Sequence, residues 1–465
     1  MILHELQLRQ GTFSVAWPNF VDWRDQNHSF EAMAAYTQDH FDLSGIQPPK
    51  LVRGARVSAA FFPLLGVQPS LGRGFTEADD KPGAVLAVVL LSSPLTAAAA
   101  SDDLACNQEP GNRYFWVERA FCDLPAHGPE NAQGAVIWNH GISGTSRSWM
   151  APAPPALRLL QARGWDVIML KRHHGADGDN ALYRTVQRTL EEAKALKKAG
   201  YRKVVLAGQS FGGYVTLEAI DTSPDIDAAI ALAPGVRSSS AAGRLDASVT
   251  DRLLQSAKVG RLALLFPKHD SLFNYAERGG SAKAILSQRA LPYLLVDETS
   301  DITGHGGGVT GRFALRYGPC LADFLAAASL PGTRFTCPPA PDGWPVVREL
   351  LLPPGEARPT FLRDGSGFPA PVAALAGPRW ALMGDSLVLV GLVDGGNAQL
   401  RLFYRSTTST GGLFDATLKD NAIHATLANK STVTLKPDAD GTITWTASDR
   451  SRSIDAPLTP GKDTD

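Results

Sequence analysis

Cysteine is scarce in this chain, and neither sign of charge is in excess. Four cysteines occur among 465 residues, and the formal net charge is −1. A chain without a basic excess lacks the charge pattern typical of proteins that bind nucleic acid or an anionic membrane surface. No CxxC pair or Walker loop is present, so neither a zinc site nor a cofactor is implied. The apolar fraction of 44% predicts a globular protein with a substantial core, and the length suggests about three domains.

The four cysteines form two pairs that are close in the sequence. Cys106 lies near Cys122, and Cys320 lies near Cys337. An even number with local pairing suits disulfides in an oxidising compartment. We expect the bridges 106–122 and 320–337, which are one of three possible connectivities. Four unrelated buried thiols are the alternative.

One apolar stretch raises the question of a membrane. Residues 84–100 carry no charged side chain and end in four alanines before the polar "SDD". A bilayer span usually takes about 20 residues, so this run is short for one. An Ala-x-Ala pattern at such a boundary is what signal peptidase reads. We expect residues 84–103 to be a signal peptide, or a single membrane anchor if they are not cleaved. A buried helix or strand is the alternative.

The remaining pattern divides the chain into three further segments. Residues 1–83 contain no nucleophile, metal cluster or phosphate loop. Residues 104–338 alternate short apolar runs such as "KVVLAG" with amphipathic stretches such as "NALYRTVQRTLEEAKALKKAG". That alternation predicts an α/β domain with a mostly parallel sheet covered by helices on both faces. Residues 345–458 alternate with period two between hairpin sequences, which predicts a small antiparallel β domain.

The sequence "LAGQSFGG" indicates a nucleophile. Gly208, Ser210 and Gly212 fit the pattern G-x-S-x-G at the junction of a predicted strand and a predicted helix. A tight turn at this junction raises the serine hydroxyl above the sheet edge, and the helix N-terminus favours developing negative charge. We expect Ser210 to be the nucleophile. A glycine-rich turn in a noncatalytic sheet is the alternative.

A serine nucleophile needs a base, and the base needs an acid to orient it. Among the later histidines, His305 lies in the glycine-rich loop "DITGHGGGVTGRF", which can reach back over the sheet edge. Asp270 ends the strand sequence "RLALLFPKHD", so its carboxylate falls at the same edge. We expect the triad Ser210, Asp270 and His305. The competing residues are His269, His424, Asp297, Glu298 and Asp301.

A tetrahedral intermediate also needs two backbone N–H donors. One should be Phe211, which follows the nucleophile. The other should come from the loop "WNHGISG" after an early strand. There His140-Gly141 resembles the HG oxyanion element of esterases, and we expect Ile142 to donate while His140 braces the loop.

Taken together, "NHGISG", "GQSFGG", "PKHD" and "GHGG" resemble the motifs of α/β-hydrolases over about residues 115–330, close to dienelactone hydrolases and small esterases. The resemblance implies a serine hydrolase without a cofactor. Its expected partner is a small-molecule or peptide acyl substrate, and no nucleic acid. Residues 14–84, with "VRGARVSAAFFPLLGVQPSLGRGFTEADDKPGA", resemble the periplasmic core domain of MacB-like ABC permeases. That family flanks the domain with membrane helices, so the resemblance implies a truncated fragment.

The sequence therefore predicts an exported serine hydrolase of periplasmic or secreted location that cleaves an ester or related acyl bond. Two alternatives remain open. The same triad also suits a serine peptidase or amidase, because it does not separate esters from amides. A noncatalytic, transport-associated periplasmic protein would instead depend on the permease-like segment.

Overall fold

The computed structural model divides the chain into two compact units, Met1–Thr96 and Ala97–Asp465, which we describe separately. The described residues are 5–7, 11–13, 17–43, 50–67, 73–80, 88–90, 106, 114–142, 150–172, 181–235, 247–272, 278–330, 332–338, 343–352, 359–363, 369, 373, 375–394, 399–440, 442–448 and 453–461.

The first unit contains two small antiparallel sheets. Its strands are β1 (Glu5–Gln7) and β2 (Gly11–Phe13), which pair with each other, and β3 (Tyr36–Leu43), β4 (Lys50–Val57) and β5 (Val88–Leu90), which form the second sheet in that order. The helical elements are α1 (Trp17–Asp25), α2 (Phe61–Leu65) and the 3-10 turn η1 (Glu77–Asp80). Strand β5 lies inside the apolar run 84–100, whose other residues lie outside the described part of the chain.

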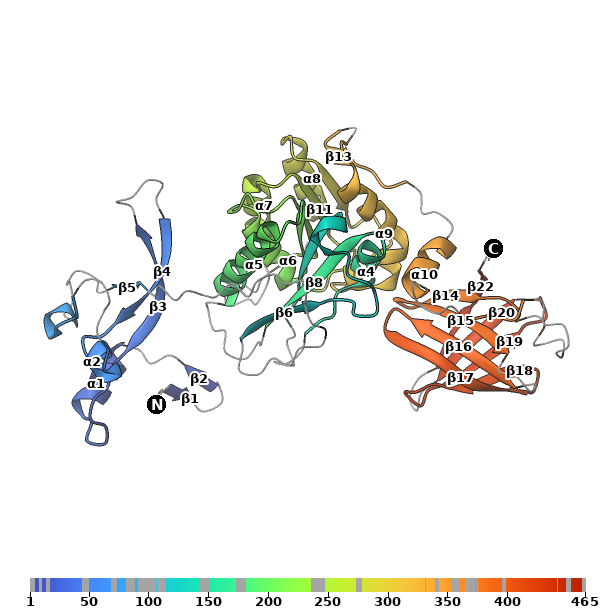
Figure 1. Cartoon of the computed structure of the whole chain (residues 1–465), viewed down its shortest axis with the longest axis horizontal. Helices are drawn as coiled ribbons and strands as arrows, with labels where there is room; N and C mark the ends of the chain where they lie inside the picture. Colours follow the sequence, from blue (N-terminus) through green and yellow to red (C-terminus); the bar gives the residue numbers. More distant parts are fainter. Residues whose placement is uncertain are drawn as a thin grey trace. The chain divides into compact units, whose positions relative to one another are not determined.

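The second unit contains an eight-stranded sheet in the order β13-β12-β11-β10-β9-β7-β8-β6 (Figure 1). Neighbouring strands are parallel, except that β6 is antiparallel to β8 at one edge. The prediction of a mostly parallel sheet is therefore confirmed. The strands are β6 (Phe115–Arg119), β7 (Gly134–Asn139), β8 (Trp165–Arg172), β9 (Val204–Gln209), β10 (Ala228–Leu232), β11 (Arg261–Leu265), β12 (Tyr293–Val296) and β13 (Arg334–Phe335).

Helices cover both faces of this sheet, as predicted, because its strands are apolar on both sides. Successive side chains of a strand point to opposite faces. In β7, Val136 and Trp138 belong to one buried cluster, whereas Ala135 and Ile137 belong to the other. The first cluster includes α4 (Pro155–Ala162), α9 (Gly311–Ala326) and α10 (Gly343–Leu351). The second includes α5 (Ala181–Lys198), α6 (Phe211–Ala219), α7 (Ala247–Ser256) and α8 (Arg278–Ser287), and the short elements α3 (Gly128–Asn131) and η3 (Gly307–Val309) complete the helical set described here.

The C-terminal part of this unit is a separate antiparallel sheet of nine strands, which confirms the predicted β domain. Its order is β21-β20-β19-β18-β17-β16-β15-β14-β22. Because β22 directly follows β21 in the chain and pairs with β14, the two edges of the sheet are joined by a short connection. The strands are β14 (Arg379–Met383), β15 (Ser386–Asp394), β16 (Leu400–Ser406), β17 (Ser409–Lys419), β18 (Ala422–Thr426), β19 (Thr432–Pro437), β20 (Ile443–Ser448), β21 (Ser453–Pro457) and β22 (Thr459–Pro460).

The two sheets of the second unit share one apolar cluster. Leu387 and Leu389 of β15 and Phe403 of β16 are buried in the same cluster as α4, α9 and α10. Since each fully buried large apolar side chain contributes about 1.5–3 kcal/mol, this contact stabilises both sheets. The β domain therefore packs against α9 and α10 of the α/β sheet.

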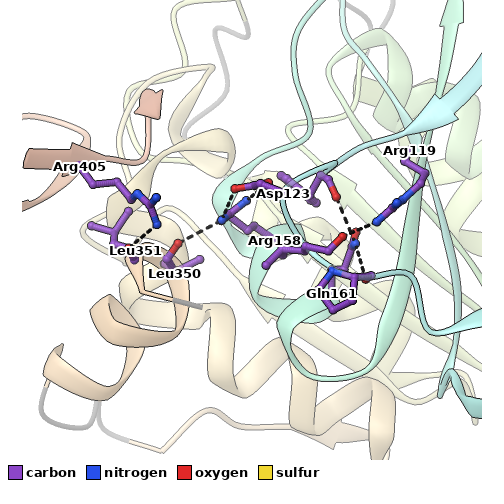
Figure 2. A network of polar contacts seen from close by, with 10 residues as sticks. Arg119, Asp123, Arg158, Gln161, Leu350, Leu351 and Arg405 are labelled. Atoms are coloured by element: carbon purple, nitrogen blue, oxygen red, sulfur yellow. Dashed lines mark hydrogen bonds and ion pairs between the residues drawn. The ribbon is translucent and has the colours of Figure 1, made fainter. Parts of the chain in front are cut away.

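Two arginines bind the carboxyl end of α10 from opposite sides (Figure 2). Arg158 Nε of α4 donates to the carbonyl of Leu350 at 3.0 Å, and Arg405 Nη1 of β16 donates to the carbonyl of Leu351 at 2.9 Å. Arg158 also forms a bidentate ion pair with Asp123. The last carbonyls of a helix have no partner within the helix, and cations are favoured there. These arginines thus satisfy the helix end that joins the two sheets.

Both predicted disulfides are present, Cys106–Cys122 and Cys320–Cys337. The second joins α9 to the segment that follows β13. Disulfides are typical of proteins that fold in an oxidising compartment. Among the described residues, no helix combines the length and the apolar character needed to cross a membrane.

Replacement of Arg158 by Met should lower the free energy of unfolding by about 1–3 kcal/mol, because the Leu350 carbonyl loses a partly buried donor. The ion pair contributes little to this loss, since the Asp123 side chain is 46% exposed. Urea denaturation followed by tryptophan fluorescence measures the change. Arg252→Met, at an exposed position of α7, is the control. An unchanged midpoint in Arg158→Met would contradict the role given to this contact.

Candidate active site

Ser210 lies on a strained turn between β9 and α6. Its backbone has φ 55° and ψ −119°, which is a conformation that residues with a side chain rarely adopt. Three hydrogen bonds hold the turn: Ser210 N donates to Leu232 O at 2.9 Å, and Ser210 O accepts from Tyr214 N and Gly235 N. The strain is thus fixed by the end of the neighbouring strand and the first turn of the helix.

The two glycines of the G-x-S-x-G pattern are required by close backbone contacts. A Cβ on Gly208 would lie 2.1 Å from the carbonyl oxygen of Gly212, and a Cβ on Gly212 would lie 1.9 Å from that of Asn139. Both distances are far below van der Waals contact. The helix can approach β7 and β9 this closely only without side chains at these positions, which is why the sequence carries glycine there.

Asp270 and His305 are in contact. His305 Nδ1 lies 2.9 Å from Asp270 Oδ2 and 3.1 Å from Oδ1. The ionised carboxylate can only accept, so Nδ1 carries the proton and Nε2 is the basic nitrogen of the neutral ring. The side chain of Asp270 is 7% exposed and that of His305 is 17% exposed. The acid is therefore shielded from solvent, while the imidazole keeps some access.

Backbone hydrogen bonds hold the two loops that carry this pair. Lys268 N donates to Ile302 O at 2.8 Å, and Gly304 N donates to Lys268 O at 2.7 Å. His269, which follows Lys268, adopts φ 55° and turns the chain just before Asp270. The loop after β11 and the loop after β12 are thus joined at the carboxyl edge of the sheet.

Gln209 links the histidine loop to the serine turn. Its side-chain amide donates to the backbone carbonyl of His305 at 3.0 Å. Because Gln209 directly precedes Ser210, this bond fixes the histidine loop beside the serine turn. Gln209 was not among the predicted site residues. Its position as the variable residue of G-x-S-x-G gave no signal for this contact.

The predicted oxyanion loop lies against Ser210. A Cβ on Gly141 would lie 3.4 Å from Ser210 Cβ and 2.7 Å from the Gln209 side-chain oxygen. His140 is fully buried, and its Nδ1 lies 2.8 Å from Gly141 O, as expected for a residue that braces the loop. Ile142 is 48% exposed, while Phe211 begins α6 and is buried. Phe211 N–H belongs to the first turn of that helix, where the N–H groups have no partner within the helix.

The competing residues have other surroundings. His424 lies in β18 of the β domain, where it contacts Thr434, and His269 is exposed. Among the alternative acids, Asp297 accepts from Thr299, Glu298 accepts from the backbone of Gly279, and Asp301 pairs with Arg316. These contacts are with residues other than His305, whereas Asp270 contacts His305 directly.

A buried arginine beside the predicted oxyanion loop was not among the predicted site residues. Arg172, the last residue of β8, is fully buried, and its Nη2 donates to the carbonyls of His140 and Gly141. Burial lowers its pKa to about 9, so the guanidinium remains charged at neutral pH. A cation at the end of the apolar run "WDVIMLKR" was a signal in the sequence, but only the fold shows which carbonyls it contacts.

Comparison with known proteins agrees with this architecture. Residues 135–300 match the model of the alpha/beta hydrolase family. This match, together with the sheet order and the serine turn, makes that region an alpha/beta hydrolase domain. No curated protein sequence matches the chain significantly.

Solved structures with similarity include an esterase of Pyrococcus furiosus, which is 16% identical over 42% of this chain and 83% of that chain, with a TM-score of 0.31. A protein assigned as a dienelactone hydrolase from Klebsiella pneumoniae is 13% identical over 39% of this chain and 78% of that chain, with a TM-score of 0.29. Dipeptidyl peptidase 4 of Porphyromonas gingivalis is 16% identical over 45% of this chain and 33% of that chain, with a TM-score of 0.34.

Substitution of Gly212 by Ala should strongly destabilise the second unit, because the added Cβ meets a backbone oxygen that cannot move without shifting β7. Gly280→Ala is the matched control, since a Cβ on Gly280 in α8 meets no atom within 4 Å. Thermal unfolding followed by circular dichroism compares the two variants. We expect a midpoint lowered by several degrees for Gly212→Ala and an unchanged or higher midpoint for Gly280→Ala. Equal midpoints would show that the turn tolerates a side chain.

Proposed function

We propose that this protein is a serine hydrolase that cleaves an ester or a related acyl bond through Ser210, His305 and Asp270. The observation that carries the proposal is the contact between His305 Nδ1 and Asp270, held by Gln209 beside the strained serine turn. The order nucleophile, acid, histidine along the chain is the order that alpha/beta hydrolases use. The family match over residues 135–300 supports the same reaction class.

The proposed chemistry assigns one role to each side chain. His305 Nε2 takes the proton from Ser210 Oγ as that oxygen attacks the carbonyl carbon of the substrate. Asp270 keeps Nδ1 protonated and stabilises the imidazolium that forms. His305 then returns the proton to the leaving group, which leaves an acyl group on Ser210. Water activated by His305 attacks this acyl-enzyme, releases the acid and restores the serine.

Backbone N–H groups stabilise the negative charge of the tetrahedral intermediate in this proposal. Phe211 N–H lies at the start of α6, where the helix dipole also favours negative charge. Ile142 N–H follows Gly141, which lies against Ser210. Donors placed on either side of the nucleophile suit an oxyanion better than the neutral carbonyl of the substrate.

The proposal predicts that Ser210→Ala, His305→Asn and Asp270→Asn each lower kcat for p-nitrophenyl acetate by about 10³-fold or more, because the three groups act as one unit. Release of p-nitrophenol measures the rate. His269→Asn is the matched control for the histidine, since His269 is exposed and asparagine tolerates its positive φ. Turnover that survives Ser210→Ala in folded protein would overturn the proposal.

We further propose that the hydrolase is exported, with residues 84–103 as its signal peptide. The two disulfides support an oxidising compartment. In this proposal residues 14–84, whose sequence resembles a fragment of the MacB-like periplasmic core, take no part in the reaction.

Export predicts that the mature protein begins near Ser101 when the chain is produced in a bacterium with a working secretion system. Intact-mass analysis of the protein from the periplasmic fraction measures where it begins. A protein that retains its first hundred residues would contradict cleavage. If such a protein remains with the membrane fraction, the anchor interpretation replaces the signal peptide.

A further inference from the structure

Arg172 is an unusual charge for the interior of a sheet. It ends β8, pairs with Phe115 of β6 in the strand register, and has no exposed surface. Burying a cation is costly unless partners compensate for lost water. Among the described residues, no ion pair involves Arg172, and its Nε and Nη1 lie buried without a hydrogen-bond partner. A charge kept at such a cost points to a purpose other than stability.

The contacts that Arg172 does make are with the two segments that flank Ser210. Its Nη2 donates to His140 O at 2.6 Å and to Gly141 O at 3.2 Å. Its guanidinium carbon lies 4.7 Å from the ring centroid of Phe211, within the range of a cation–π interaction. One buried cation therefore contacts both the oxyanion loop and the residue after the nucleophile.

The bond to Gly141 O determines how the next peptide group is turned. In a trans peptide the C=O and the following N–H point in opposite directions. Because Gly141 O is held toward Arg172, Ile142 N–H must point away from it. His140 Nδ1 lies 2.8 Å from the same oxygen, and since a carbonyl can only accept, that nitrogen carries the proton. Two donors thus hold this carbonyl on the side away from Ile142 N–H.

We propose that Arg172 is a positioning residue that orients the Ile142 N–H of the oxyanion hole and adds a fixed positive charge behind it. This inference rests on the proposed hydrolase function. The peptide plane cannot flip without breaking both bonds to Gly141 O. The charge acts through the buried interior of the protein, where its interaction with a developing oxyanion is screened less than at a surface.

The cation–π contact extends the same effect to Phe211. The ring is held over the guanidinium while the backbone of Phe211 forms the first residue of α6. Loss of Arg172 would remove the support of that ring and the anchor of the loop together. We therefore expect its replacement to weaken binding of the transition state more than binding of the substrate.

The test compares Arg172→Met and Arg172→Lys with the wild-type protein. Measured quantities are kcat and KM for p-nitrophenyl acetate and Ki for 2,2,2-trifluoroacetophenone, whose adduct with a serine places an oxyanion in the hole. We expect Arg172→Met to lower kcat and raise Ki by the same factor, about 10–100-fold, with KM changed less than about threefold. Arg172→Lys keeps the charge but not the planar guanidinium, so its kcat and Ki should lie between those of the wild-type protein and those of Arg172→Met.

Arg278 provides a matched control. It is also buried, stacks on Phe266 at 4.5 Å, and donates to a backbone carbonyl, that of Pro234. Arg278→Met should lower the melting temperature but leave kcat and Ki within about threefold of wild type. A loss of kcat and a rise of Ki in Arg278→Met as large as in Arg172→Met would mean that removal of any buried arginine has this effect, and would overturn the inference.

Three further results decide the matter. If Arg172→Met keeps wild-type kcat and Ki, the inference is wrong. If Arg172→Met does not fold, Arg172→Lys decides, and an unchanged Ki in that variant contradicts the role. Ser210→Ala, assayed alongside, separates the two claims: turnover that survives it overturns the hydrolase proposal, whereas its loss beside a fully active Arg172→Met overturns only the role of Arg172.

Discussion

The close approach of α6 to strands β7 and β9 is the constraint on which the site depends. Gly208 and Gly212 let the backbones come within distances that no side chain allows. The same approach forces Ser210 into a positive-φ turn. It also sets the Asn139 carbonyl against the start of the helix, so the loop that begins with His140 emerges beside the serine. The positive-φ turn at Ser210 and the placement of the loop that begins with His140 therefore both follow from one packing contact.

The parallel order of the strands determines where the loops that carry the site residues lie. In a parallel sheet all carboxyl ends meet at one edge, so Ser210 and the loops that carry Asp270 and His305 all lie at that edge. Hydrogen bonds through Lys268 and Gln209 hold those loops. One face of the sheet is stabilised by the β domain as well as by helices, since α10 and the β domain share its apolar cluster. The β domain thus adds to the core of the α/β sheet and is not attached by a linker alone.

Much of the fold and of the candidate site was predictable from the sequence, because the patterns that indicate them involve residues close together in the chain. The G-x-S-x-G pattern needed only its flanking strand and helix, and the cysteine pairs needed only their spacing. Strand β6 was missed because Glu118 is buried inside it, paired with Lys171, and this breaks the expected alternation of apolar and polar residues. Helix α10 was missed because a proline-rich stretch precedes it and resembles a linker. Arg172 was missed because its partners are carbonyls more than thirty positions away, which sequence cannot indicate.

The central claim is that Ser210 is the nucleophile, made reactive by His305. Peptide mapping by mass spectrometry after treatment with a fluorophosphonate tests it most directly, because the reagent bonds covalently to an activated serine. The account predicts a single modified peptide that carries the label on Ser210, and no label on that peptide in His305→Asn. Folded wild-type protein that stays unlabelled, or carries its label on another serine, would contradict it.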